Sequence, residues 1–161
     1  MSTGVAGGTV RLLPAAPAAE SYAAHLAAAG PLPVFRGDEL VAELDRAGLT
    51  GHGGAAFPAG VKWRAVAERA RGHGAVVVGD GMETEPASLK DRTLLALRPH
   101  LVFDGMVLAA AALAARRVVL CVASANDALA RTLAAALAER RPSAAHEPRI
   151  ELVTSPSRYI A

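Results

Sequence analysis

The sequence has one cysteine, Cys121, among its 161 residues. A single thiol cannot form an internal disulfide, and it cannot supply the thiolates that hold an iron–sulfur cluster. Both are therefore excluded within this chain. Because Cys121 lies in the apolar run 118–122, we expect it to be buried in the core. His73 and His100 lack the spacing of metal ligands, so we expect them in loops or at the surface and predict no metal site.

Aromatic residues are also scarce, at 4 % of a chain that is 52 % hydrophobic. Alanine supplies much of the difference, and it favours closely packed helices. The net charge of +2 gives no electrostatic case for binding nucleic acid. No basic segment precedes an apolar run at the start, which argues against a signal peptide. The longest apolar run, 106–115, is shorter than the about 20 residues of a membrane span. We therefore expect a cytoplasmic protein without direct membrane insertion.

Helix-like and strand-like segments alternate along the chain. This alternation predicts an α/β, Rossmann-like three-layer domain with a mostly parallel sheet. We expect a flexible arm over residues 1–18, with a possible strand at 9–13, and one domain over 19–161. The expected strands are 75–78, 117–123 and 149–154. The expected helices are 19–29, 39–47, 61–72, 100–115 and 124–140, with a single helical turn at 93–97. Asp38 is the expected cap of the second helix and Ser124 that of the last.

Residues 49–63 form a glycine-rich stretch that runs into the helix expected at 61–72. Its four glycines are followed by Lys62 and Trp63. Such a loop exposes backbone N–H groups at a helix start, where the helix dipole favours an anion. No Gly-Lys-Ser/Thr triplet follows and no strand precedes the loop, so it is neither a P-loop nor a dinucleotide fingerprint. A phosphate-binding loop and a plain surface turn between two helices both remain open at this point.

A second stretch, 78–92, follows the first expected strand and begins with an acidic loop. In parallel sheets, ligands bind beyond the carboxyl ends of the strands, which is where Glu83 and Glu85 fall. They are either site residues or exposed loop acids. The mixed charges Lys90, Asp91 and Arg92 are more typical of a solvated loop.

The two stretches together resemble a known family. The pattern Gly-x-Gly-Gly-Ala-x-Phe-Pro-x-Gly-x-Lys-Trp is similar to the flavin loop of the NADH-binding flavoprotein subunit of respiratory complex I, and of related NAD-linked hydrogenase and formate dehydrogenase subunits. The run 78–92, Val-Gly-Asp-Gly-Met-Glu-Thr-Glu-Pro-Ala-Ser-Leu-Lys-Asp-Arg, agrees in order and distance, and 99–101 and 104–106 continue the likeness. The resemblance covers roughly residues 36–161.

The resemblance implies a domain that binds flavin mononucleotide (FMN) and receives a hydride from NADH. The hydride chemistry belongs to the cofactor, so no catalytic side chain is predicted. Further subunits or a redox protein would take up the electrons. The resemblance also assigns residues by position. Those at the FMN phosphate and flavin edge are Gly51, Gly53, Gly54 and Lys62, and Glu83 is the acid of the flavin loop. Phe57 is the aromatic residue that stacks on NADH, and Glu85 is the acid near the nicotinamide nucleotide.

Three further cofactor-binding positions carry residues that differ from the family pattern. His52 stands for an arginine, Asp80 for an asparagine and Met82 for an aspartate, and Thr84 replaces a glycine beside them. Residues 157–161 resemble the lead-in to a Gly-Glu-Glu segment that completes the flavin site, so we expect a fragment or a reduced relative. An iron–sulfur cluster is then expected only in a missing C-terminal region. The alternative is a non-catalytic domain that keeps the fold and binds a nucleotide or a protein.

Overall fold

The computed structural model describes residues 12–13, 18–35, 37–52, 54–83, 85, 87–141 and 146–156. Within these ranges the chain forms a three-stranded parallel sheet in the order β1-β2-β3, with β1 at Ala75–Gly81, β2 at Ala115–Ala123 and β3 at Ile150–Ser155. The three expected strands and their parallel arrangement are confirmed. Strand β1 continues three residues beyond the expected end at 78. The expected arm and the possible strand at 9–13 lie mostly outside the described residues.

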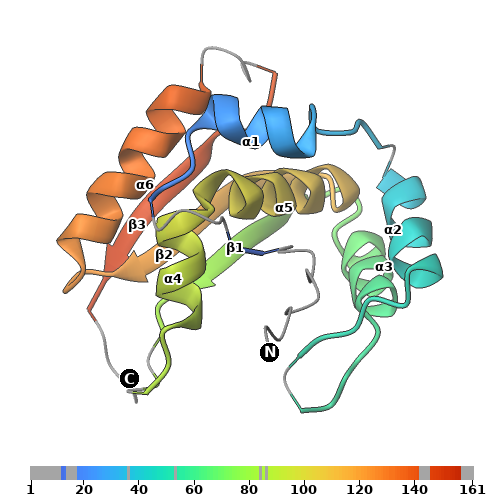
Figure 1. Ribbon diagram of the computed structural model, residues 1–161. Coiled ribbons are helices and arrows are strands. Elements are labelled where there is room, and N and C mark those ends of the chain that lie inside the picture. The colour runs from blue at the N-terminus through green and yellow to red at the C-terminus, as the bar shows by residue number, and fades with distance from the viewer. Residues whose placement is uncertain are drawn as a thin grey trace, which may run out of the picture.

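Both crossover connections contribute helices to one face of the sheet. Helices α4 (Lys90–Leu97) and α5 (Pro99–Ala112) connect β1 to β2, and α6 (Asp127–Arg140) connects β2 to β3. Figure 1 shows these helices together in front of the sheet. Phe103, Leu133 and the β2 residue Leu120 are fully buried between them. The α/β class is therefore confirmed. On the other face, Val76, Val78 and Val153 are exposed.

Toward the carboxyl end of β1, the residues that face the helices are Gly79 and Gly81. A Cβ at Gly79 would lie 2.9 Å from Met106 Sδ of α5, and one at Gly81 would lie 2.7 Å from Leu95 Cδ1 of α4. Both distances are too short for ordinary packing. The glycines therefore let α4 and α5 approach the end of β1 closely, which also sets where the loop after Gly81 begins.

Three helices precede the sheet: α1 (Tyr22–Ala29), α2 (Gly37–Arg46) and α3 (Ala59–Arg69). Leu40 and Val41 of α2 are buried. Helices α2 and α3 pack on each other at the right of Figure 1, and α1 lies across α5 and α6. The element Ala59–Arg69 carries the chain directly out of the glycine loop.

Two expected helix starts are wrong in position. Asp38 lies in the first turn of α2 instead of capping it. Helix α6 is capped by Asn126 and not by Ser124, because the Asn126 side chain accepts a hydrogen bond from Leu129 N–H at 3.3 Å. The single turn expected at 93–97 is a full helix that begins at Lys90.

Two of the expected side-chain environments also need correction. His100 is fully buried near the start of α5, and not at the surface, since α1 covers it through Tyr22. Cys121 is half-buried on the outer face of β2 rather than inside the core. His73 lies in an exposed turn after α3, as expected.

A cluster of buried charges joins α1, α5 and α6, and we call it the buried charge cluster. Arg140 is 3 % exposed and donates to both carboxylate oxygens of Glu147, at 2.7 and 2.8 Å, and to Asp104 Oδ1 at 2.6 Å. His25, fully buried, places Nε2 2.7 Å from Asp104 Oδ2 and Nδ1 3.3 Å from Glu20 Oε2. Paired charges of this kind can be buried because each carboxylate keeps donors.

His100 borders this cluster, and neither of its ring nitrogens makes a hydrogen bond among the described residues, although Nε2 lies 3.5 Å from Glu139 Oε2. Burial lowers its pKa below the ordinary value of 6.5, and the charges of His25 and Arg140 add to this, while Glu139 offsets part of the effect. The folded protein therefore holds His100 neutral more strongly than the unfolded chain does.

We expect the free energy of unfolding to fall as the pH drops below about 6.5, because the unfolded chain takes up a proton on His100 before the folded one does. His100→Leu should flatten this part of the profile between pH 7 and 5. Urea denaturation at several pH values measures it. His73→Leu, in the exposed turn, should keep the wild-type slope, and an unchanged slope in His100→Leu would contradict the assignment.

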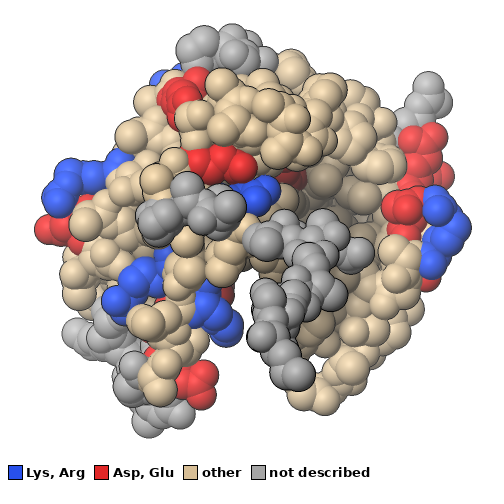
Figure 2. All heavy atoms as spheres, in the orientation of Figure 1, with Lys and Arg blue, Asp and Glu red and all other residues tan. Residues whose placement is uncertain are grey.

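Among the described residues, no single helix is long and apolar enough to cross a membrane. Helices α4 and α5 reach the length and hydropathy of a membrane span only when they are taken together, and the chain bends by 98° between them. The same residues include no group of three or more His, Cys, Asp and Glu side chains that could hold a metal ion. Figure 2 shows acidic and basic side chains interspersed on the face it presents.

Candidate functional site

The glycine loop closes on itself as a hairpin before α3. Gly51 N–H donates to Phe57 O at 2.9 Å, Ala59 N–H donates to Leu49 O at 2.8 Å, and Thr50 and Pro58 form an antiparallel bridge. Gly54 has φ of +57°, and a Cβ there would meet no atom within 4 Å. Glycine is therefore favoured at this position by the backbone conformation and not by a lack of space for a side chain. Gly53 lies outside the described residues.

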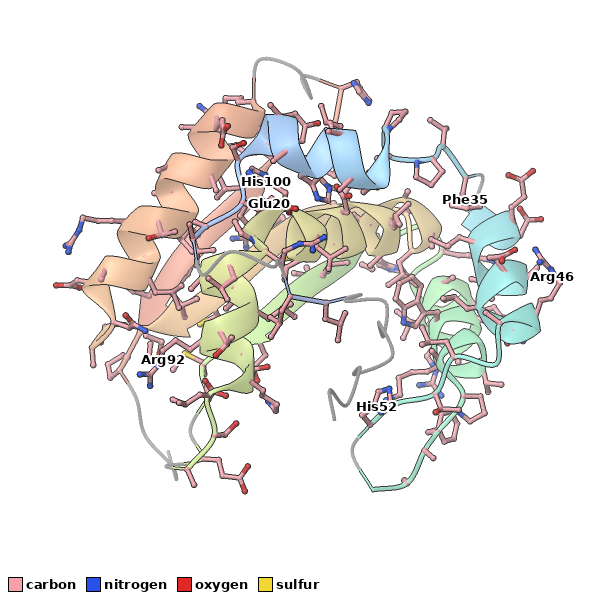
Figure 3. The ribbon with its side chains drawn as sticks, viewed as in Figure 1. Glu20, Phe35, Arg46, His52, Arg92 and His100 are labelled. Carbon is pink, nitrogen blue, oxygen red and sulfur yellow. The ribbon has the colours of Figure 1, made fainter. Side chains whose placement is uncertain are left out.

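The loop presents an aromatic ring and a cation side by side. Phe57 is 48 % exposed, and Lys62 Nζ lies 5.8 Å from the centroid of its ring. Lys62 is the fourth residue of α3 and is exposed. Figure 3 shows His52 on the same loop. The loop thus combines exposed backbone with a mobile ammonium group, as an anion site requires.

Gly60, the last of the four glycines, has a different role. It is buried inside α3, and a Cβ there would overlap the Asp45 carboxylate and lie 3.2 Å from Val41 O of α2. Asp45 also pairs with Arg64. Gly60 therefore sets the distance between α2 and α3 and does not face a ligand.

The strand-end loop begins at the carboxyl end of β1. Asp80 Oδ1 accepts a hydrogen bond from Met82 N–H at 3.1 Å, which turns the chain away from the strand. The Met82 thioether accepts a weak hydrogen bond from Cys121 Sγ of β2 at 3.6 Å. Met82 is therefore packed against the strand end, and Glu85 beyond it is exposed.

Glu83 holds this loop on the start of α4. Its carboxylate accepts hydrogen bonds from Ser88 Oγ at 2.7 Å and from the N–H groups of Asp91 and Arg92 at 3.0 and 3.1 Å. Burial alone would raise the pKa of Glu83, but these three hydrogen bonds and the charge of Lys90 lower it. The residue has φ of +38°, a conformation that non-glycine residues rarely adopt and that often occurs at functional sites.

The sequence did not predict this capping role. Glu83 lies seven residues before Lys90, the first residue of α4, and the known local capping patterns do not extend that far. Glu83 remains a predicted flavin-loop acid, and its carboxylate also fixes the backbone around it.

Glu83→Gln should lower the free energy of unfolding by about 1 kcal/mol, the usual size of a helix-cap contribution. The amide loses the negative charge favoured at a helix start, and its NH₂ group cannot accept from Asp91 or Arg92 N–H. Urea denaturation measures the change. Glu85→Gln, two residues along in an exposed position, is the matched control, and equal losses in both variants would show that the cap is not responsible.

A cavity of about 220 Å³ lies at the carboxyl ends of β1 and β2. Met82, Glu83 and Asn126 line it, together with Arg92 of α4. Figure 3 shows Arg92 on the α6 side of α4. This is the edge of a parallel sheet at which ligands bind in other α/β proteins.

Figure 1 shows the glycine loop and the strand-end loop at the same end of the molecule, on either side of a gap. The assignment of the ten predicted site residues to FMN and NADH stays a prediction.

The phosphate end of FMN fits the glycine loop. Gly54 is in the left-handed region with no atom within 4 Å of its Cβ position, so its backbone is open to a ligand. Lys62 supplies a positive charge at the start of α3, over the Phe57 ring of the same loop. At the strand end, the carboxylates of Asp80 and Glu83 already accept hydrogen bonds from backbone N–H groups. These residues shape the loop that a flavin would contact.

Comparison with known proteins finds similar sequences and a similar solved structure. One subunit of NADH-quinone oxidoreductase from Escherichia coli (strain K12) is 39 % identical over 80 residues, which are 50 % of this chain and 18 % of that protein. The corresponding protein of Streptomyces coelicolor is 41 % identical over 73 residues, 45 % of this chain and 16 % of that protein. A crystal structure of NAD⁺-reducing [NiFe]-hydrogenase in the H₂-reduced state matches with a TM-score of 0.64 and 32 % identity, covering 76 % of this chain and 21 % of that chain.

The chain therefore spans about a fifth of the length of these proteins. These relatives are of the kind that residues 49–63 and 78–92 resemble in sequence. FMN is the cofactor of the family concerned. Residues 44–161 match the sequence model of the Nuo51 FMN-binding domain, and the chain belongs to that family.

Proposed function

We propose that this chain is the FMN-binding part of an NADH-oxidising flavoprotein. The observation that supports it most directly is the glycine loop, in which a left-handed Gly54 lies inside a hairpin and the helix that follows carries Lys62. Bound FMN supplies the acceptor for a hydride from NADH. The chain's own residues bind and orient the two nucleotides.

In this proposal, Gly51, Gly53 and Gly54 border the FMN phosphate and Lys62 neutralises it. The Gly51 N–H stays bonded to Phe57 O, so the backbone donors to the phosphate come from Gly53 and Gly54. His52 adds a further donor on the same loop. The start of α3 contributes its dipole, which favours an anion.

At the other end of the site, Asp80, Met82 and Glu83 form the wall along the flavin. Glu83 holds the backbone of this wall on α4, so it positions the loop as well as bordering the ligand. NADH would stack on the exposed ring of Phe57, with Glu85 near its nicotinamide nucleotide. Release of Lys62 from Phe57 to the phosphate would free that face of the ring.

The proposed setting is a cytoplasmic assembly. Relatives named as subunits of NADH-quinone oxidoreductase support a role beside further subunits, which would accept the electrons. Iron–sulfur clusters would belong to those parts, since Cys121 is the one cysteine of this sequence.

The test is titration of the purified protein with FMN, followed through flavin absorbance and fluorescence. We expect saturable binding of FMN. Absence of any binding at millimolar FMN would overturn the proposal.

The second candidate is a domain that keeps this fold without redox activity. It is favoured by the engaged carboxylate of Glu83 and by the packing of Met82 on Cys121. Steady oxidation of NADH by the FMN-loaded protein with ferricyanide as acceptor would exclude it. FMN binding without NADH oxidation would support it.

A further inference from the structure

Strand β3 leaves one edge without a neighbour among the described residues. It is the last strand in the order β1-β2-β3, and Figure 1 shows it as the outermost strand beside α6. Ser124 N–H donates to Ser155 O at 2.8 Å, so the backbone groups of Ser155 point toward β2. Because successive residues of a strand direct these groups to opposite edges, Ile150, Leu152 and Thr154 direct theirs to the free edge. A free edge of this kind can pair with another strand.

A groove runs along this edge between β3 and α6, with a volume of about 620 Å³. Ala134, Leu137 and Ala138 of α6 line one side, and Leu152 and Val153 of β3 line the other. Val153 is 42 % exposed. The small side chains of α6 leave room for the side chains of an added strand, which would enter the groove at every second residue.

The amino end of the groove is basic. Arg141 follows the last turn of α6 and Arg149 precedes β3, and both line the groove. Both are exposed, and Arg149 also acts through its charge on Glu151 of β3. The one acid that lines the groove is Glu151, whose pKa is lowered mainly by two hydrogen bonds from Arg117, at 3.1 and 2.7 Å, and also by the charge of Arg149. Its charge is therefore largely matched, and the two arginines leave an excess of positive charge.

We propose that the free edge of β3 is a docking site for an extended segment of a partner protein that carries acidic residues at the end facing Arg141 and Arg149. The segment adds a fourth strand to the sheet. Its backbone bonds to Ile150, Leu152 and Thr154, and its alternate side chains enter the groove beside Leu137. This surface lies at the opposite end of α6 from Asn126 and the strand-end cavity, and the inference does not depend on FMN binding.

The probes are two synthetic peptides, Glu-Glu-Thr-Val-Thr-Val and the reverse order Val-Thr-Val-Thr-Glu-Glu, because an added strand can run either way. We expect at least one to shift the backbone amide NMR signals of Leu152 and Thr154. The same peptides with lysine in place of glutamate should bind more weakly, as should versions with proline at the second threonine, which removes a backbone donor.

On the protein side, Arg141→Glu combined with Arg149→Glu should weaken binding of the acidic peptide by about tenfold, as two rim charges reverse. Arg131→Glu on α6, exposed and outside the groove, is the matched control and should leave binding unchanged. Thr154→Pro removes an outward N–H and should abolish the amide shifts, while circular dichroism checks that the fold is kept.

Equal binding of acidic and lysine peptides would overturn the charge assignment, and unshifted amides at millimolar peptide would overturn the docking site. Association of the protein with itself through Leu152 and Thr154, detected by analytical ultracentrifugation, would identify a second copy as the occupant and overturn the proposed partner.

Discussion

Arg140→Leu is expected to lower the free energy of unfolding by about 3–5 kcal/mol, the usual result of removing one member of a buried ion pair. The guanidinium is 3 % exposed and donates to Glu147 twice and to Asp104 once. Without it, the Asp104 and Glu147 carboxylates lose this cation while they stay largely shielded from water, with side chains that are 14 % and 9 % exposed. It also packs over the Tyr22 ring, with Cζ 5.1 Å from the centroid, so α1 loses a contact as well.

Urea denaturation followed by circular dichroism measures this loss. Arg117→Leu is the matched control, because Arg117 makes a comparable two-bond pair with Glu151 at an exposed position, where solvent screens the charges. We expect only a small change there. If the two variants lose similar amounts, the burial of Arg140 is not what makes it important.

A double-mutant cycle separates the pair from the rest of the network. Asp104→Asn leaves a neutral partner for both Arg140 and His25. Arg140→Leu and Asp104→Asn should be far from additive, since once Arg140 is absent the Asp104 charge is itself unfavourable. Additive losses would mean that the two side chains act independently.

The sheet was predictable from local sequence, because buried parallel strands are short, continuous apolar runs. In β2, Val118, Leu120 and Val122 face the helices and are buried, and the residues between them are also apolar. The glycine loop was predictable for a related reason, since positive φ at Gly54 has few other solutions. Both signals need only neighbouring residues.

The features that sequence reasoning missed depend on residues far apart in the chain. His100 was expected at the surface, but Tyr22 of α1 covers it across 78 positions, and an isolated histidine carries no sign of such a cover. Likewise, Asn126 and Ser124 are both residue types that cap helices. The conformation of the turn after β2 determines that Asn126 is the one at the start of α6. The site assignments at Glu83 and Met82 rest on family resemblance, while the structure adds the contacts that hold these side chains.

Lys62→Ala is expected to weaken FMN binding by roughly one to two decades, because a charge-assisted contact contributes about 1.5–3 kcal/mol. The ammonium group stands over Phe57 at 5.8 Å from the ring centroid, and Lys62 is the fourth residue of α3, which follows the glycine loop directly. Riboflavin lacks the phosphate, so its binding should change much less. The comparison of the two ligands therefore tests where Lys62 acts.

Isothermal titration of FMN and riboflavin into wild type and variants measures both affinities. Arg69→Ala is the matched control, since Arg69 is an exposed cation in the last turn of α3 and should leave both unchanged. Gly54→Ala should also weaken FMN binding, through strain at φ of +57° of about 1–2 kcal/mol and not through a clash. Equal losses for FMN and riboflavin in Lys62→Ala would place its contact on the flavin ring, and no loss for either would leave the loop a turn between α2 and α3.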